Sequence, residues 1–285
     1  MNKIDFSVSM CVYGGDNPEY FNVAFNSIIN QSLPPTEIVL TIDGPISQEM
    51  ESVIQNKRNQ LQKLPIVFKV IRNKDNLGHG KARELCIQNC TNQLIALMDS
   101  DDISVYDRFK KQIVFFQNNT NISVVGGFIT EFTSASDADN ILNVTGKRIV
   151  PLNDADIKQY MKKRCPLNQM TVMFKKQDIE EVGGYLDWFC NEDYYLWIRL
   201  AKAGKLFANI SDTLVNVRVG ADMYQRRGGI KYFRSEFGIQ NLMYKSKMIG
   251  LSRFVINVSE RFIVQLLMPN KIRGIFFQKL ARTKQ

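Results

Sequence analysis

Ile95-Ala-Leu-Met-Asp-Ser-Asp-Asp102 is the stretch on which the interpretation of the whole chain depends. Its apolar part, Leu94 to Met98, predicts a short buried strand. Three carboxylates then fall within four positions, at Asp99, Asp101 and Asp102. Carboxylates this close repel one another unless a cation, a hydrogen-bond donor or water neutralises them, and a divalent metal fits best. A solvated turn in which Asp102 caps the next helix is the alternative that this stretch leaves open.

Strands and helices alternate on the N-terminal side of this stretch. The predicted strands are 6–13, 37–42 and 66–71, and the predicted helices are 18–30, 47–61 and one that follows Gly80 and ends at Cys90. Such alternation with short loops predicts a parallel, doubly wound sheet. Ligands of these sheets bind beyond the carboxyl ends of the strands. Four polar or aromatic candidates fall there, namely Tyr13, Asp43, Asn76 and Asp99.

The loop Asn76-Leu-Gly-His-Gly80 matches neither the GxGxxG dinucleotide signature nor a Walker A loop. A glycine loop at a helix start can still hold phosphate through backbone N–H groups at Gly78 and the side chains of Lys81 and Arg83. The simpler alternative is that Gly78 and Gly80 only shape the loop. Asp43 likewise has the alternative of starting a turn.

Composition limits the classes of function. The chain has 285 residues, of which 45% are hydrophobic and 23% charged, as in an ordinary globular protein, and its net charge of +9 predicts an anionic partner. Five cysteines without a CxxC pair and a single histidine, His79, argue against structural zinc and Ser-His-Asp catalysis. Because neither a signal peptide nor a membrane-spanning segment is recognisable, we expect a cytoplasmic protein with reduced cysteines.

The second half of the chain contains another acidic pair. Residues 168–174 predict a strand, a short helix reaches Val182, and the helical spacing of Leu196, Trp197 and Leu200 follows. Glu192 and Asp193 therefore occupy the first turn of a helix, with Asn191 as a candidate cap. Acids at this position also complement the helix dipole, so a purely structural role is the alternative.

Four segments in this order resemble the successive motifs of the family 2 glycosyltransferases. They are Ser9-Met-Cys-Val-Tyr13, Ile38-Val-Leu-Thr-Ile-Asp-Gly44, Asn76-Leu-Gly-His-Gly-Lys-Ala-Arg83 and Met98-Asp-Ser-Asp-Asp102. The resemblance implies the GT-A fold, a mixed α/β sheet flanked by helices, and sugar transfer from a nucleotide diphosphate donor with inversion at the anomeric carbon. Glu192-Asp193 resembles the ED motif of that family.

The resemblance also implies roles for single residues. Asp43 would bind the nucleobase, usually uracil, Asp99 the ribose or the metal, and Asp101 the Mn²⁺ or Mg²⁺ that bridges the diphosphate. Asp193 would be the general base, with Glu192 beside it in the catalytic pair. The full set that we expect to bind the nucleotide sugar is Tyr13, Asp43, Asn76, Gly78, Lys81, Asp99, Arg226 and Arg227.

Arg226 and Arg227 belong to a basic glycine-containing segment that follows the strand-like residues 214–219. Such a segment can close over a diphosphate, and a solvated charged turn is the alternative. It lacks the tryptophan of the QxxRW motif of processive synthases. Together with the lack of membrane spans, this difference favours transfer of a single sugar.

The last 35 residues are basic and amphipathic. Seven lysines and arginines accompany one acid, Glu260, and Pro269 separates two apolar clusters. We expect two amphipathic helices that lie on an anionic membrane surface where a lipid-linked acceptor resides. Packing of these helices on their own domain is the alternative. The predicted division is a catalytic domain over 1–220, with a nucleotide-binding half (1–102) and an acceptor-binding half (103–220), followed by a helical C-terminal extension over 221–285.

The sequence therefore predicts a metal-dependent, inverting glycosyltransferase of bacterial polysaccharide biosynthesis, for O-antigen, capsule or exopolysaccharide. It would act at the cytoplasmic face of the cell membrane. A non-catalytic or hydrolytic sugar-nucleotide-binding protein of the same fold is the alternative, which an intact Asp193 disfavours. A nucleic-acid partner is not expected, because no such motif occurs and the basic excess is concentrated at the C-terminus.

Overall fold

The computed structural model describes residues 4–135, 141–220 and 228–269. The strands are β1 (Phe6–Tyr13), β2 (Glu37–Asp43), β3 (Val67–Asn73), β4 (Leu94–Met98), β5 (Ile103–Ser104), β6 (Val124–Ala135), β7 (Ile141–Arg148), β8 (Met173–Lys175) and β9 (Phe207–Arg218). The helices are α1 (Pro18–Ile29), α2 (Gln48–Leu61), α3 (His79–Gln88), α4 (Arg108–Asn118), α5 (Asp154–Met161), α6 (Lys176–Glu181), α7 (Glu192–Lys202), α8 (Ile230–Lys245) and α9 (Leu251–Phe262). A short π-helix, Ile263–Leu267, continues α9.

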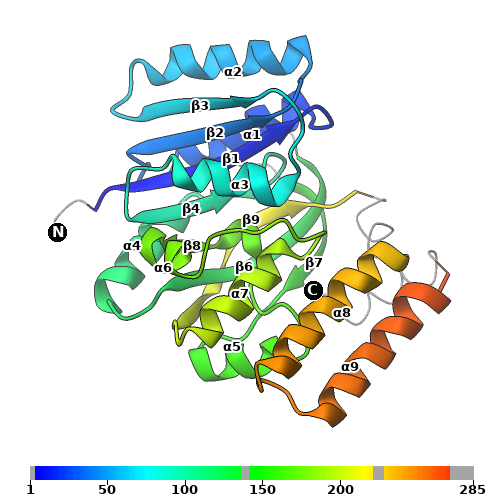
Figure 1. The fold of residues 1–285 in the computed structure, drawn as a ribbon. Coiled ribbons are helices and arrows are strands. Elements are labelled where there is room, and N and C mark those ends of the chain that lie inside the picture. The colour runs from blue at the N-terminus through cyan, green and yellow to red at the C-terminus, as the bar shows by residue number, and fades with distance from the viewer. Residues whose placement is uncertain (1–3, 136–140, 221–227, 270–285) are drawn as a thin grey trace.

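All strands of the described part join one mixed sheet, in the order β3-β2-β1-β4-β8-β6-β9-β5, with β7 paired to β6 (Figure 1). The first four strands in this order are parallel, which confirms the alternation predicted for the N-terminal half. β8 is antiparallel to both β4 and β6, so the sheet becomes mixed in its second half. The parallel strands β1, β2 and β4 therefore end at one common edge.

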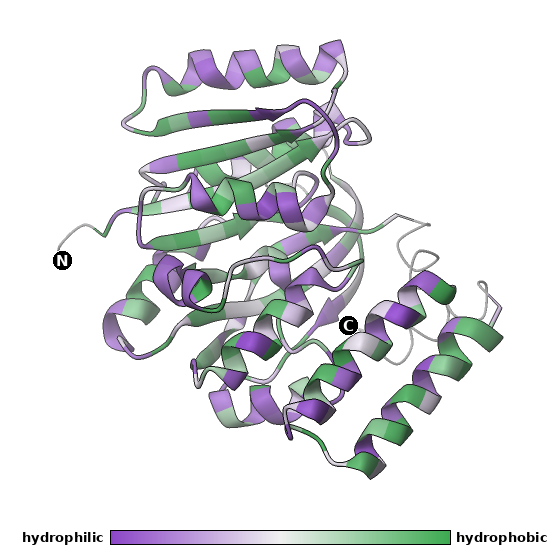
Figure 2. Cartoon of the chain, in the orientation of Figure 1, coloured by the Kyte–Doolittle hydropathy of each residue, from purple (hydrophilic) through white to green (hydrophobic). Residues whose placement is uncertain are grey.

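Helices cover both faces of this sheet, and each face has its own hydrophobic core. Alternation along the strands sends Val8 and Met10 to the core beneath α1, α2 and α4, whereas Ile95 and Leu97 belong to the core beneath α3, α5 and α7. α8 also packs on the core beneath α3, α5 and α7, to which it contributes Ile239. Figure 2 shows hydrophobic colouring along the inner strands and mostly hydrophilic colouring on α2.

The strand predicted over 168–174 is wrong in its first half. A 3-10 turn (Gln169–Thr171) occupies this stretch, and β8 begins only at Met173. The hydroxyl of Thr171 donates to the carbonyl of Asn168 (2.7 Å), and Nδ2 of Asn168 donates to the carbonyl of Gly127 (2.8 Å). Side chains of this kind offer the backbone an alternative to strand pairing.

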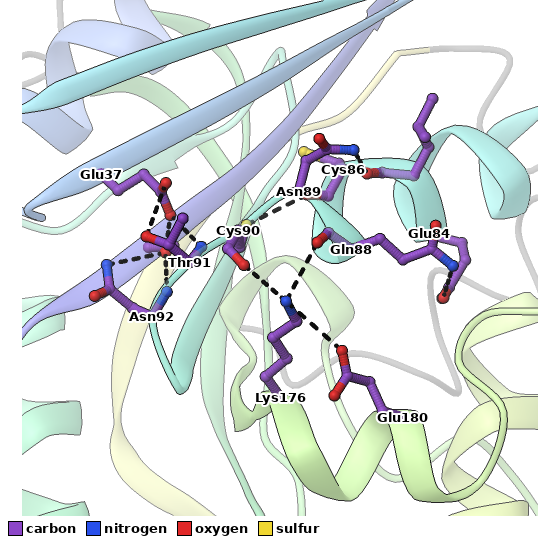
Figure 3. Close-up of polar contacts among 12 residues, drawn as sticks. Glu37, Glu84, Cys86, Gln88, Asn89, Cys90, Thr91, Asn92, Lys176 and Glu180 are labelled. Carbon is purple, nitrogen blue, oxygen red and sulfur yellow. Dashed lines mark hydrogen bonds and ion pairs between the residues drawn. The ribbon is translucent and has the colours of Figure 1, made fainter.

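The C-terminal end of α3 is fixed against the sheet by polar contacts (Figure 3). Nζ of Lys176 donates to the carbonyl of Gln88 (3.2 Å), the last residue of α3, and to the carbonyl of Cys90 (2.7 Å), two residues further on. The carboxylate of Glu37 in β2 accepts hydrogen bonds from N–H and the hydroxyl of Thr91. α3 is therefore held at one end, while its other end points to the carboxyl edge of the parallel strands.

α8 and α9 lie side by side at one end of the molecule (Figure 1). Phe237 of α8 contacts Phe254 of α9 with ring centroids 5.9 Å apart, and Phe233 contacts Phe262 at 5.8 Å. Within the three described ranges, no helix has the length and hydropathy needed to cross a bilayer. All five cysteines are free; Cys86 and Cys90 are buried as expected, whereas Cys190 is exposed.

Candidate active site

The ends of three parallel strands bring the predicted binding residues to the same edge of the sheet. Tyr13 ends β1 in register with Asp43 at the end of β2. Met98, the last residue of β4, is in register with Met10 of β1, so Asp99 follows at this edge. The predicted convergence of Tyr13, Asp43 and Asp99 is therefore confirmed as a feature of the fold.

Asp43 organises the loop that precedes α3. Its carboxylate is 4% exposed and accepts hydrogen bonds from Nδ2 of Asn73 (2.9 Å) and from N–H of Leu77 (2.9 Å) and Gly78 (3.0 Å). The side-chain oxygen of Asn76 also accepts from N–H of Gly78 (3.0 Å). A carboxylate offers about four acceptor positions, so Asp43 keeps capacity for one ligand donor. Its role in binding a nucleobase stays a prediction.

The groups predicted to hold phosphate have partners within the protein. N–H of Gly78 is occupied by Asp43 and Asn76, so Gly78 serves chiefly the loop conformation, with φ of 88°. Nζ of Lys81 pairs with Oδ2 of Asp187 (2.9 Å) at a site where both side chains are more than half exposed. An exposed pair of this kind is weak and exchanges readily, so Lys81 remains available to an anionic ligand.

The three aspartates after β4 have different environments. Asp99 is partly exposed, and its Oδ1 accepts a hydrogen bond from Nη2 of Arg83 (2.8 Å). Asp101 is exposed, whereas Asp102 is buried and its Oδ1 accepts from the backbone N–H of Arg218 (2.9 Å). Because α4 starts only at Arg108, Asp102 does not cap the next helix. Burial and the charges of Asp101 and Asp99 raise the pKa of Asp102.

Asp16, just after β1, is a further acid at this edge, in addition to Asp43 and the three aspartates after β4, and sequence reasoning missed it. Burial and the nearby charge of Asp99 raise its pKa. The side chain of Asp101 reaches solvent but is partly desolvated by its surroundings, and this desolvation with the charges of Asp99 and Asp16 raises its pKa to about 6. Asp16 follows the end of a parallel strand, so the rule that selected Tyr13 was also the signal for it.

Asp99 and Asp101 have the chemistry of a divalent cation site. No three histidine, cysteine or acidic side chains converge into a complete metal centre among the residues that the structure describes. Mg²⁺ and Mn²⁺ prefer carboxylate oxygens, and the repulsion that raises the pKa of Asp101 is relieved when a cation binds. These two residues therefore fit a cation that takes its remaining ligands from a bound diphosphate.

Glu192 and Asp193 start α7, as predicted, but Asn191 does not cap the helix. Nδ2 of Asn191 instead donates to the hydroxyl of Ser235 in α8 (3.0 Å). The first turn of α7 packs on α3 at Gly80, where an added Cβ would lie 3.5 Å from Cβ of Glu192 and 2.8 Å from a backbone oxygen of the loop before α7. Gly80 is therefore required for this close approach.

A chain of side-chain hydrogen bonds joins this acidic pair to the aspartates after β4. Nδ1 of His79 lies 2.7 Å from Oε1 of Glu192, and Nε2 of His79 lies 2.8 Å from Nη2 of Arg83, which also contacts Asp99. A guanidinium can only donate, so Nε2 accepts and the proton of the neutral imidazole resides on Nδ1, facing Glu192. The sequence predicted that Arg83 holds phosphate; in the structure this buried side chain links two acidic sites instead.

Asp193 is the more basic member of the acidic pair. Burial, followed by the adjacent charge of Glu192, raises its pKa to about 6. Glu192 behaves differently: although burial acts in the opposite direction, its contact with His79 and the charge of Arg83 lower its pKa. Sγ of Cys165 lies 3.6 Å from Oδ2 of Asp193. The pair therefore consists of a fixed carboxylate and a more basic neighbour.

Two predicted residues of the site are not described by the structure, and two other residues at the site were not predicted. Arg226 and Arg227 fall outside the described residues. Arg218, at the end of β9, was missed: its Nε donates to the carbonyl of Asp101 (3.2 Å), and its guanidinium lies 3.8 Å from the ring centroid of Tyr20. His79 was noticed only as the single histidine, because its partner lies 113 positions further along the chain.

The comparisons with known proteins show the family of the chain. The model of the family described as glycosyl transferase family 2 matches residues 7–176. A glycosyltransferase of amylovoran biosynthesis from Erwinia amylovora is 33% identical over 96% of this chain and 98% of its own length. A UDP-Gal:alpha-D-GlcNAc-diphosphoundecaprenol beta-1,3-galactosyltransferase from Escherichia coli is 33% identical over 97% of this chain and 96% of its own length.

The fold agrees as well. A mannosyltransferase from Pyrobaculum calidifontis, solved in complex with GDP-Man and Mn²⁺, superimposes with a TM-score of 0.63 at 12% identity, covering 98% of this chain and 74% of that chain. The mixed sheet flanked by helices is thus the GT-A fold, as predicted. The chain belongs to glycosyl transferase family 2 and is a glycosyltransferase.

Proposed function

We propose that this enzyme transfers one sugar from a UDP-sugar to a hydroxyl of a lipid-linked saccharide, with inversion at the anomeric carbon. The Escherichia coli relative, by its name, takes galactose from UDP-Gal to a diphosphoundecaprenol-linked sugar, and the Erwinia amylovora relative serves amylovoran biosynthesis. Because both align over nearly their full length, a role in the synthesis of a bacterial surface polysaccharide is the natural extension.

One observation carries the mechanism: the linkage of Glu192 to Asp99 through His79 and Arg83. It holds the start of α7 beside the strand edge where the donor would bind. Asp193, next to Glu192, then accepts the proton of the acceptor hydroxyl as this oxygen attacks the anomeric carbon. With a pKa of about 6, Asp193 is ionised at neutral pH and is still basic enough for this transfer.

The donor side is proposed from the placement of the strand ends. Tyr13, Asp43 and Asn76 would bind the nucleoside, because Tyr13 is in register with Asp43 and the loop that contains Asn76 is held by the carboxylate of Asp43. Lys81 would leave its exposed partner to contact the diphosphate. Arg226 and Arg227 remain candidates for the same role. A divalent cation held by Asp99 and Asp101 would offset the charge of the leaving nucleotide diphosphate.

The C-terminal helices support the membrane part of the proposal, because α9 buries polar side chains and exposes apolar ones. The inward residue Asn257 is 1% exposed and hydrogen-bonds a carbonyl after α5 and a glutamine of α8, and Gln265 in the π-helix is 5% exposed. Leu251, Val255 and Ile256 are 47% to 60% exposed. A helix that turns its apolar side outward needs an apolar partner.

We propose an anionic lipid surface as that partner, because exposed cations flank the apolar side. Lys245 and Lys247 are exposed where α8 leads into α9. Arg261, by contrast, does not contribute: its guanidinium pairs with Glu236 of α8, and both side chains are nearly buried. The predicted second helix lies at 270–285, outside the described residues. Catalytic residues 1–220 and the extension 221–285 would thus act together at the cytoplasmic face of the membrane.

A direct binding measurement tests the donor side. We expect UDP-sugar to bind the wild-type protein in the presence of Mn²⁺ or Mg²⁺ by calorimetry, and Asp101→Ala to remove the metal-dependent part of that affinity. Asp212→Ala, which removes a half-exposed acid paired with Lys111 on the surface, is the matched control. Metal-independent binding of equal strength in Asp101→Ala would refute the cation site.

A transfer assay tests the reaction itself. Incubation with a UDP-sugar and a lipid-linked saccharide should release UDP and form a product whose new glycosidic bond has the opposite anomeric configuration to the donor, as measured by NMR. Release of UDP at the same rate with and without acceptor would identify a hydrolase instead.

A further inference from the structure

A cavity of about 330 Å³ lies between the loop before α7 and the first turns of α8. It is lined by Asp187, Trp188, Phe189, Lys231, Arg234 and Ser235. We propose that this cavity binds the diphosphate and the first sugar of a lipid-linked acceptor. This inference rests on the proposed function, and it assigns the acceptor site to the junction of α7 and α8.

The cavity is attached directly to the acidic pair that starts α7. Its Ser235 accepts a hydrogen bond from Nδ2 of Asn191 (3.0 Å) and donates one to the carbonyl of Phe189 (2.6 Å). Asn191 is the residue immediately before Glu192. The contacts of Ser235 therefore connect the cavity to the start of α7, two residues before the proposed base Asp193.

The charges of the cavity suit a diphosphate. Lys231 and Arg234 lie at the start of α8, where cations oppose the helix dipole, and neither takes part in an ion pair among the described residues. The start of α8 also has no side-chain cap, so the dipole and both cations favour an anion. The one acid of the lining, Asp187, has a side chain that is 65% exposed, so water and salt screen its charge. A diphosphate would therefore supply the charge that the start of α8 lacks.

The aromatic wall suits a sugar ring. Trp188 stacks on Tyr195 with centroids 4.1 Å apart and an interplanar angle of 7°. On α8, a Cβ added to Gly238 would lie 2.6 Å from the indole ring, so this glycine makes room for Trp188. Phe189 is 53% exposed beside it. Fixed aromatic faces of this kind pack against the C–H groups of a sugar without an ordering cost.

The surroundings of the cavity suit the lipid. The backbone N–H of Gly229, at the start of α8, donates to the carbonyl of Gln265 (3.1 Å), so this end of α8 lies against the π-helix after α9. Ile263 and Leu267 in that π-helix are 53% and 63% exposed. A diphosphate at Lys231 would therefore have an exposed apolar surface next to it for the alkyl chain.

Two measurements without vesicles test this proposal. The first is binding of decyl diphosphate, compared with decanol, by thermal shift of the full chain. The second is transfer to a decyl diphosphate that carries N-acetylglucosamine, compared with decyl N-acetylglucosaminide. The variant Lys231→Ala with Arg234→Ala changes two exposed side chains, and Lys63→Ala with Lys110→Ala, two exposed lysines after α2 and in α4, is the charge-matched control.

We expect the Lys231 and Arg234 variant to bind decyl diphosphate about tenfold or more weakly, as loss of charge-assisted hydrogen bonds predicts. Its KM for the diphosphate acceptor should rise by a similar factor, while the Kd of UDP-sugar and the KM for decyl N-acetylglucosaminide stay unchanged. Phe189→Ala should raise the KM of both acceptors.

The outcomes separate this site from the proposed function. Wild-type affinity for decyl diphosphate no greater than for decanol, or equal weakening in the control variant, would overturn the acceptor site. Retained diphosphate binding with no binding of any UDP-sugar would overturn the proposed function and leave the cavity as a diphosphate site.

Discussion

α7 and α9 are helices of 11 and 12 residues with similar amphipathic sequences, yet they use their apolar sides in opposite ways. α7 buries Leu196, Trp197 and Leu200 completely against the sheet. α9 buries Asn257 and leaves Val255 half exposed. An apolar stripe shows that a helix needs an apolar partner, and it does not say whether the partner is the domain itself. For α7 the partner is the sheet, which explains why its first turn is rigid enough to hold an acidic pair.

The largest effect is expected at the start of α7. Asp193→Asn should lower kcat about 10²- to 10⁴-fold because it removes the acceptor of the proton, while the Kd of UDP-sugar stays the same. Steady-state transfer and calorimetry measure the two quantities. Glu260→Gln, the matched change on α9, should leave kcat unaltered. If Asp193→Asn turned over at nearly the wild-type rate, the base would have to be another group.

The second effect concerns stability. Trp197→Ala should lower the free energy of unfolding by about 3 to 5 kcal/mol, because the indole is fully buried in the core. Val255→Ala on α9 should change it by less than about 0.5 kcal/mol. Urea denaturation monitored by circular dichroism compares them. Comparable losses in both variants would mean that the apolar side of α9 is covered by its own chain.

The third effect concerns lipid. Ile263→Ser with Leu267→Ser should weaken binding to phosphatidylglycerol vesicles about tenfold or more, since each apolar side chain contributes about 1.5 kcal/mol or more when it enters lipid. Leu64→Ser with Val67→Ser, two exposed apolar residues near the start of β3, is the control and should not alter binding. Co-sedimentation at low salt measures both, and binding equal to wild type by the variant of Ile263 and Leu267 would remove the membrane from the proposal.

The smallest effect is a displacement of the pH profile. Asp193 must be ionised to accept a proton, so kcat should fall about tenfold per unit of pH below its pKa of about 6 and be level above it. The charge of Glu192 contributes to raising that pKa, so Glu192→Gln should move the acid limb to lower pH. If the acid limb of Glu192→Gln were unchanged, or lay at higher pH, the limb would not report the ionisation of Asp193.

Much of the structure of residues 1–102 could be predicted from the sequence. The strands that end at Tyr13, Asp43 and Met98 lie within two residues of their predicted bounds at both ends, because apolar runs followed by glycine, proline or aspartate specify them locally. The placement of Asp99 at the common edge followed from parallel pairing alone.

The rest depended on contacts between distant parts of the chain. The pair of His79 and Glu192 has no local signature, because neither helix specifies how it will sit on the other. The local sequence allowed Asn168 to lie in a strand and the side chain of Asn191 to cap α7. In the structure, both side chains instead donate hydrogen bonds to residues that are distant in the sequence. The orientation of α9 depends on the hydrogen bonds of Asn257 to a carbonyl just after α5 and to a glutamine of α8, which periodicity cannot reveal.

The position of Trp188, which stacks on Tyr195 and lies close to Gly238, has a spectroscopic consequence. The chain has two tryptophans, and Trp197 is sealed in the core, where its emission should be insensitive to solutes. Any shift or quenching of intrinsic fluorescence during a titration would then originate from Trp188. The native protein thus contains its own optical reporter for whatever enters the space beside α8.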